Sequence, residues 1–386
     1  VLSVPFVVIS TYMVFLPPED AGGAYLLGWM FLMYVGWTML TISHMSWAAE
    51  LSDDYDERSR IQGAREGALI LGALLVLAIP FLFAMFDPQS DAHDHFAAMG
   101  LFVIILLPFT VGASVTIVKE TKAPPPPQIP ILTALKTMMR HKPLRTILWV
   151  DLIGGLSGGT VAVLFLPLAN LVFGLSDVEA GGMLLVYFLS GVLFVPVIVR
   201  LAYRFGKHRT LAVASLINAF TVPFIFFMPP GDIVLITVLW GILGINLGAG
   251  ALLIRAMTAD IIDMDQIETG AQRTGVFYAL INMTTKLGYA VAVGSAGFFL
   301  ELLFGFDLKA ETQSAEALFG LKLVYVVMPV AVAIVAFFLL WNFPLDRGAQ
   351  ERLRKAIAER EALLKTQQPT MESPETPTGD ELSRQT

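Results

Sequence analysis

Long apolar runs recur along the whole chain and constrain its fold more than any other feature. A helix needs about 20 apolar residues to cross roughly 30 Å of hydrocarbon. One short run and nine fuller ones lie approximately at 1–16, 24–49, 67–86, 96–118, 146–168, 180–199, 210–228, 233–258, 276–304 and 317–341. Because these runs are continuously apolar and do not alternate, they predict membrane-spanning helices rather than barrel strands.

Composition excludes several classes of function. Hydrophobic residues make up 56% of the chain and charged residues 15%, against about 25% charged in soluble domains. Without cysteine, the chain holds no disulfide framework, iron–sulfur cluster or thiolate nucleophile. No Gly-rich phosphate loop occurs, and the histidines show no metal-ligand spacing beyond His93 and His95. We expect an all-α polytopic membrane protein that is not an enzyme, has the bilayer as its partner and binds no nucleic acid.

Basic residues gather in alternate loops, which predicts the orientation. Cytoplasmic loops accumulate Lys and Arg. If residue 1 lies inside, all 25 Lys and Arg except Lys286, Lys309 and Lys322 fall in or beside cytoplasmic loops. The opposite loops carry Asp and Glu. The pattern predicts a multi-pass protein of the plasma (inner) membrane with both ends in the cytoplasm.

One basic, proline-rich stretch divides the chain at 119–145. Four spans precede it in 1–118 and six follow in 146–341, whereas 342–386 predicts a cytoplasmic tail, helical at first and then disordered. Transporters of the major facilitator type have two six-helix halves. We therefore expect that fold with about ten helices present and the first two absent.

Polar residues inside apolar spans are candidates for function, because the bilayer makes them costly. Lys286 lies near the middle of its span and predicts an ion or substrate pathway; the alternative is a structural salt bridge. Asn282, one turn earlier, serves either a polar site or helix packing. Asp151, six residues after Arg145, either pairs with a basic group near a gate or is a shallow, wetted carboxylate.

Three further side chains are candidates for substrate contact. Arg65 begins a span and could bind sugar hydroxyls through its guanidinium, although a snorkelling arginine is the ordinary alternative. Trp37 and Trp240 could stack on sugar rings, or could anchor the protein at the interface. His44 could titrate, or could be a hydrogen-bonded core histidine.

Charged residues in the predicted cytoplasmic loops are candidates for gating, because alternating access needs contacts that open and close on that face. Their ordinary alternative is a solvated surface. The candidates are Glu50, Asp53, Arg58, Arg204, Arg209, Asp260, Asp263 and Arg273. A weak internal repeat relates 50–67 to 260–275, which are equivalent loops of the two halves.

Two loop sequences carry a family resemblance. Ser46-Trp-Ala-Ala-Glu50-Leu-Ser-Asp53, continuing to Arg65, is similar to a loop signature of the glycoside-pentoside-hexuronide:cation symporters, the melibiose permease family. Ala259-Asp260-Ile-Ile-Asp263, continuing through Arg273 to Lys286, resembles that family's tenth-to-eleventh loop and eleventh-helix lysine. Together with 204–209, these motifs cover nearly the whole chain in the expected order.

The resemblance implies a twelve-helix symporter that couples Na+ or H+ entry to uptake of a sugar or glycoside, with no other cofactor. It places Arg65 at the sugar site and Lys286 beside the cation site. The family's paired aspartates of the second helix would precede residue 1. At 42–43 no aspartate occurs where the melibiose permease has one, and His44 replaces a common proline.

We therefore predict sugar or glycoside:cation symport by alternating access, by a monomer. Arg65, Trp37, Trp240 and Asn282 are the predicted substrate-binding residues. Lys286 and Asp151 are the predicted cation-coupling residues. The alternatives are an amphiphile or lysolipid symporter of the same fold and, from another class, a membrane sensor that transports nothing.

Overall fold

The structure is a computed structural model that describes residues 2–51, 55–87, 90–118, 139–269, 273–307 and 312–344. Every regular element within these ranges is a helix. Eight of the described helices are long and apolar enough to cross a membrane, and two shorter apolar helices lie at Ser3–Phe15 and Gly67–Pro80. The prediction of an all-α polytopic membrane protein is confirmed.

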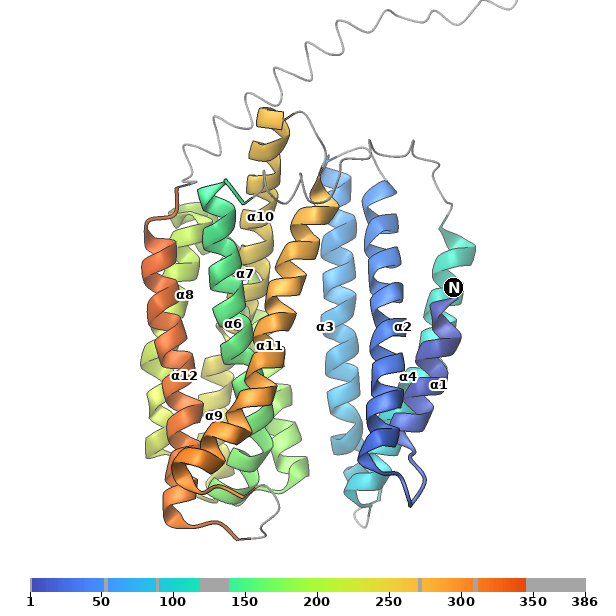
Figure 1. Ribbon diagram of the computed structural model, residues 1–386, viewed down its shortest axis with the longest axis vertical. Helices are drawn as coiled ribbons and strands as arrows, with labels where there is room; N and C mark the ends of the chain where they lie inside the picture. The colour runs from blue at the N-terminus through green and yellow to red at the C-terminus, as the bar shows by residue number, and fades with distance from the viewer. Residues whose placement is uncertain are drawn as a thin grey trace, which may run out of the picture.

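The N-terminal half consists of four helices, drawn in blue to cyan in Figure 1: α1 (Ser3–Phe15), α2 (Gly23–Glu50), α3 (Tyr55–Phe86) and α4 (Ala92–Ile117). Helix α1 packs against α2 and α4, and α3 packs against α4. At the crossing of α1 and α2, a Cβ on Gly36 would lie 2.9 Å from the side chain of Val7. A glycine therefore lets these two backbones approach closely.

The C-terminal half consists of helices α6 to α12. They are α6 (Lys142–Pro167, continued by a π-helical turn Leu168–Val172), α7 (Asp177–Phe205), α8 (Lys207–Thr221, continued by a 3-10 turn Val222–Phe227), α9 (Ile233–Gly244), α10 (Leu247–Thr269), α11 (Thr274–Phe304) and α12 (Ala315–Trp341).

Two boundaries in this half differ from the sequence prediction. The predicted span at 233–258 is divided between α9 and α10 by a break at Ile245 and Asn246, and α10 then extends to Thr269. Helix α6 begins at Lys142, inside the predicted linker 119–145. Residues 119–138 of that linker lie outside the described residues, as does the predicted tail from 345 onward.

Polar residues cap several helices at the end of the bundle opposite the start of α6. Asp91 and Asp94 form a reciprocal capping box on α4, and Ser176 and Glu179 form another on α7. Asp232 accepts the Leu235 backbone N–H at the start of α9. Acidic residues of the predicted outer loops therefore satisfy backbone donors that a helix start leaves unpaired.

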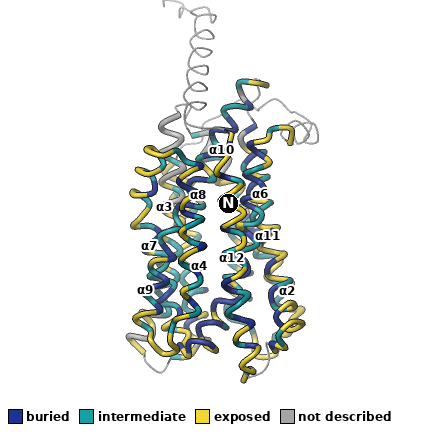
Figure 2. The backbone as a smooth tube through the Cα atoms, turned by 90° about the vertical axis from the view of Figure 1, so that its left-hand side faces the viewer, coloured by how far each residue is buried: buried dark blue, intermediate teal, exposed yellow. Residues whose placement is uncertain are grey.

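Two clusters of buried apolar side chains form the core, and both lie entirely within the C-terminal half. One contains Phe173 and Trp240, and the other contains Met257 and Phe277. Among the described residues of the N-terminal half, Val7 is the one buried hydrophobic side chain. Figure 2 shows how buried positions are distributed along the backbone.

The two halves stand side by side, with α2 and α3 facing the C-terminal half (Figure 1). Helix α3 packs against α7, which is the main described contact between the halves. Helix α11 borders the N-terminal half on the face turned to the viewer in Figure 1. Polar groups on α2, α3 and α11 therefore lie near the boundary between the halves.

Candidate functional site

Asp151 on α6 accepts hydrogen bonds from two hydroxyl groups of α11. The hydroxyl oxygens of Thr284 and Thr285 lie 2.8 and 2.5 Å from the same carboxylate oxygen, Oδ2. Both hydroxyls also lie within hydrogen-bond distance of the Ile281 carbonyl, at 2.8 and 3.1 Å. The Asp151 side chain is buried, with 8% of its surface exposed. A charged group is thus held between two apolar helices, about 13 Å from the start of α6.

Close packing of α6 and α11 creates this contact. A Cβ on Gly155 would lie 2.5 Å from the Thr285 carbonyl oxygen, and one on Gly159 would lie 2.7 Å from Ala292. On α11, Gly288 leaves equally little room beside Leu152. Because the backbones are so near, short threonine side chains can reach the carboxylate.

Arg255 on α10 adds a cation to this region. Its charge interacts electrostatically with Asp151, although its own side chain is exposed. Sequence reasoning missed Arg255, Thr284 and Thr285. Arg255 could have been found as a lone charge inside the predicted span 233–258, whereas nothing in the sequence marks the two threonines as partners of a residue about 130 positions earlier.

Lys286 and Asn282 are both exposed on α11. Lys286 immediately follows Thr285 and lies about 18 Å from the start of the helix. Within the described part of the chain, no carboxylate forms an ion pair with Lys286. The structure therefore places the predicted cation-coupling residues, Asp151 and Lys286, on neighbouring helices at similar depth without pairing them.

The predicted substrate-binding side chains lie in three different environments. Trp240 is 2% exposed in the core, with ring centroids 6.0 to 6.3 Å from those of Phe165, Phe173 and Tyr325. Trp37 is 47% exposed on α2. Arg65 is half-buried on α3, within electrostatic range of His44 on α2. The structure does not bring Trp240 together with the other two, because the C-terminal core encloses its ring.

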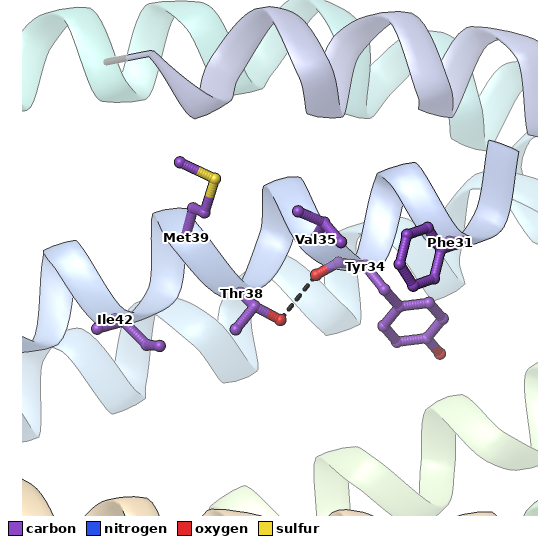
Figure 3. Close-up of a pocket in the computed structure, with 6 residues that line it drawn as sticks. All are labelled: Phe31, Tyr34, Val35, Thr38, Met39 and Ile42. Carbon is purple, nitrogen blue, oxygen red and sulfur yellow. Dashed lines mark hydrogen bonds between the residues drawn. The ribbon is translucent and has the colours of Figure 1, made fainter. Parts of the chain in front are cut away.

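An open depression of about 300 Å³ lies along one face of α2. Its lining residues follow helical spacing and are mainly apolar or aromatic: Phe31, Tyr34, Val35, Thr38, Met39 and Ile42. In Figure 3, the Tyr34 ring points toward helices of the C-terminal half, and the Thr38 hydroxyl donates to the Tyr34 carbonyl at 2.7 Å. Sequence reasoning selected none of these six, although their i, i+3, i+4 spacing could have indicated one face.

A second polar group joins α8 to α10 near the end of the bundle where α6 begins. The Lys207 ammonium donates to both oxygens of Asp260, at 2.8 and 2.7 Å, and to the Ala256 carbonyl at 3.2 Å. The Asp260 side chain is 7% exposed and that of Lys207 is 22% exposed. Asp260 was a predicted gating residue, but its partner Lys207 was not.

A third polar group fixes the connection between α10 and α11. The Arg273 guanidinium donates to both oxygens of Asp265, at 2.9 Å from Nε and 2.6 Å from Nη2. His141, just before α6, lies 3.5 Å from Asp265 and 3.6 Å from Glu268. Asp265 and Arg273 are 1% and 7% exposed. Such a bidentate pair holds both side chains in one geometry.

The other predicted gating residues are not brought into these pairs. Arg204 and Arg209 are exposed, and Arg204 lies over the ring of its neighbour Phe205. Asp263 is half-buried on α10. The side chains of Glu50, Asp53 and Arg58 lie outside the described residues. The ion pairs that the structure describes are thus internal to the C-terminal half.

One exposed group of possible metal ligands occurs at the start of α4. Ligand atoms of Asp91, His93 and Asp94 come within 4.8 Å of one another. Asp91 and Asp94 are close because they form the capping box of α4. The helix start accounts for this proximity without a metal.

Apolar helices in two facing groups, with charged and hydroxyl side chains held at membrane depth, define a polytopic membrane protein of the transporter class. The chain belongs to the family described as MFS/sugar transport protein, which matches residues 1–347. The predicted relationship to symporters of the major facilitator type is confirmed at the level of the family, and this is a family of transporters rather than enzymes.

The relatives of this chain are symporters and carriers, and two of them have different substrates in their names. It is 23% identical to the uncharacterized symporter YjmB of Bacillus subtilis over 79% of this chain and 66% of that protein. It is 23% identical to the glucuronide carrier protein homolog of Escherichia coli over 88% of this chain and 74% of that protein. It is also 22% identical to the sodium-dependent lysophosphatidylcholine symporter 1 of Gallus gallus over 93% of this chain and 75% of that protein.

Proposed function

We propose that this chain is a secondary active transporter that moves a sugar or glycoside together with Na+ or H+ by alternating access. The observation that carries the proposal is the hydrogen-bonded carboxylate of Asp151, held with Thr284 and Thr285 between apolar helices of a sugar-transport family member. Buried ionisable groups in membrane helices are expensive and mark ion or substrate pathways.

We propose the following roles for individual residues, and the placement of their side chains supports them. Substrate binds between the halves, where Arg65 on α3, Trp37 on α2 and Asn282 on α11 contribute polar and aromatic contacts. Asp151 and Lys286 couple the cation to transport from the opposite wall. Trp240 stabilises that wall by packing in its core.

Gating uses the ion pairs near the end of the bundle where α6 begins. Lys207 with Asp260, and Arg273 with Asp265, hold α8, α10 and the start of α11 as one unit that can move relative to the N-terminal half. This end faces the cytoplasm of a plasma-membrane protein. A reporter fused after Asp94 tests the orientation, since a cytoplasmic reporter there would refute it.

A second candidate function is symport of a lysolipid or similar amphiphile. Two observations favour it: the similarity to a lysophosphatidylcholine symporter along 93% of this chain, and the apolar lining of the depression on α2. An acyl chain needs no hydrogen-bond partners, so it suits such a surface better than a free sugar does.

Uptake into proteoliposomes separates these functions. Purified protein is reconstituted, and accumulation of a radiolabelled glucuronide, an alkyl glucoside and a lysophospholipid is measured under imposed Na+ or H+ gradients. We expect sugar-type substrates to accumulate and to compete with one another. Competition by lysophospholipid alone would select the second candidate, and accumulation of neither would leave a sensor role.

Lys286→Ala provides the residue-level test of this proposal. We expect at least about tenfold slower uptake, because the variant lacks a charge held at membrane depth. The matched control is Lys322→Ala, which removes a half-buried lysine that lies less deep in the span, about 10 Å from the start of α12. Unchanged uptake by Lys286→Ala would remove Lys286 from the mechanism.

A further inference from the structure

We infer that Asp151 is the proton-exchanging residue of this transporter, so that H+ rather than Na+ is its coupling ion. The inference rests on the proposed function and makes it more specific. Its basis is the unequal use of the two carboxylate oxygens. Thr284 and Thr285 both donate through their side chains to Oδ2, and the Thr285 backbone N–H also interacts with the carboxylate, whereas no described side chain donates a hydrogen bond to Oδ1.

This arrangement suits a carboxyl group that gains and loses one proton. A protonated carboxyl has one oxygen that carries hydrogen and one that only accepts hydrogen bonds. The two threonines donate to Oδ2 in either state, so a proton can bind at Oδ1 without moving them. Because Asp151 is 8% exposed, the surrounding helices restrict the access of water to that oxygen.

Charged groups around Asp151 are few. Helix α10 contributes Arg255, and α11 contributes Lys286 next to Thr285 and Tyr289 about one turn further along. On α6 itself, Arg145 lies six residues closer to the helix start. Helix α12 also packs against α6, but its titratable residues Glu316, Lys322 and Tyr325 lie in its first eleven positions, toward the opposite end.

The proton step is balanced within this group. In the outward-facing state a proton from external water forms an O–H bond at Oδ1, and the charge of the Asp151 side chain changes from minus one to zero. In the inward-facing state that bond breaks and the proton passes to cytoplasmic water. Substrate binding between the halves selects the protonated form, which couples the two movements.

A sodium ion fits the same atoms less well. Hard cations bind through several oxygen lone pairs at once. Among the described residues, this site brings together one carboxylate and two threonine hydroxyls, and both hydroxyls lie against Oδ2 and the Ile281 carbonyl. A sodium ion at Oδ1 would need further oxygen ligands, whereas a proton needs that oxygen alone.

Proteoliposomes with two assays test the inference. Substrate counterflow without an ion gradient reports binding and alternating access, and accumulation driven by a pH gradient reports coupling. We expect Asp151→Asn to retain counterflow, because the amide oxygen still accepts from both threonines. Its accumulation on a pH gradient should fall at least about tenfold, because the amide exchanges no proton. Glu301→Gln, an exposed carboxylate near the far end of α11, is the matched control and should keep both activities.

Each outcome decides between the two proposals. Wild-type counterflow with accumulation that follows Na+ alone would overturn the inference and leave the proposed function intact, as would accumulation on a pH gradient by Asp151→Asn. Absence of counterflow for every sugar and glycoside would overturn both. Thr285→Val is a second variant in case Asp151→Asn does not fold. Loss of one donor to Oδ2 should displace the pH of half-maximal accumulation while counterflow persists, and an unmoved midpoint would overturn the inference.

Discussion

The first span of the C-terminal half, Lys142–Val172, buries 39% of its most apolar stretch inside the protein, whereas the spans in α2 and α4 bury 6% of theirs. In water such exposure would be destabilising. In a bilayer it is not, because lipid tails are as apolar as the side chains that face them. The difference therefore does not rank the two halves by stability.

The closely packed C-terminal half holds its buried polar side chains in defined contacts. Asp151, Asp260, Asp265 and Arg273 are all buried in the closely packed half, and each has a charged or hydroxyl partner there. Tight packing holds those partners at fixed distances. The described N-terminal half instead offers an open face on α2. We expect substitutions at the buried polar contacts of the C-terminal half to lower stability. Substitutions on the open face of α2 should instead alter transport.

The largest expected effect follows removal of one partner of the most buried ion pair. Arg273→Ala leaves Asp265, 1% exposed, without its bidentate partner. Breaking such a pair costs about 3–5 kcal/mol. Thermal unfolding in detergent should show a strongly lowered midpoint, whereas the exposed Arg209→Ala should match wild type. Equal midpoints for the two variants would show that burial at this loop does not determine stability.

Two tryptophans, one in each half, test the comparison directly. Trp240→Ala opens a cavity among Phe165, Phe173 and Tyr325, and lipid cannot enter that enclosed space. We expect the free energy of unfolding to fall by roughly 2–4 kcal/mol, because the lost packing contacts are only part of the usual cost of such a substitution. Trp37→Ala removes an exposed ring and should leave the unfolding midpoint unchanged while it slows uptake. The reverse pattern would contradict the assignment of core and substrate surface.

The class of fold could be predicted from the sequence because apolar runs of about 20 residues are typical of membrane-spanning helices. The break between α9 and α10 could not. The run 233–258 is apolar except for a few residues such as Asn246 and Arg255, which do not by themselves predict a break. In the structure, Gly244 packs against the Tyr187 backbone and a Cβ on Gly248 would lie 2.9 Å from the Gly191 carbonyl. That break lies where α7 touches the chain, and a single sequence does not reveal such contacts.

The candidate site could be predicted in part for the same reason. Asp151 stands out as a lone charge in an apolar span, and Asp260 and Arg273 could be predicted as charged residues of a cytoplasmic loop. Their partners did not stand out. Asp265 lies among other acids, and the threonines of α11 look like ordinary helix residues until α6 is packed beside them.

A smaller effect is expected from glycine substitutions in the two halves. Gly155→Ala places a Cβ 2.5 Å from the Thr285 carbonyl oxygen, so α6 and α11 must separate, at a cost of about 1–3 kcal/mol. Gly72→Ala on α3 meets nothing within 4 Å and should stabilise slightly through helix propensity, by up to about 1 kcal/mol. Unfolding midpoints measure both changes. Similar losses at the two positions would mean that α3 is packed as closely as α6.

The smallest effects on stability are expected at the junction of α7 and α8, where Lys207 and Arg204 can be compared. Lys207→Met removes the ammonium group that pairs with Asp260 and should lower the free energy of unfolding by about 1–2 kcal/mol, less than Arg273→Ala because Lys207 is partly solvated. Arg204→Met, an exposed position three residues earlier, should stay within about 0.5 kcal/mol. Uptake provides the sharper measurement. If gating depends on the buried pair, Lys207→Met slows uptake and Arg204→Met does not, because one residue holds α10 in place and the other contacts mainly solvent and Phe205.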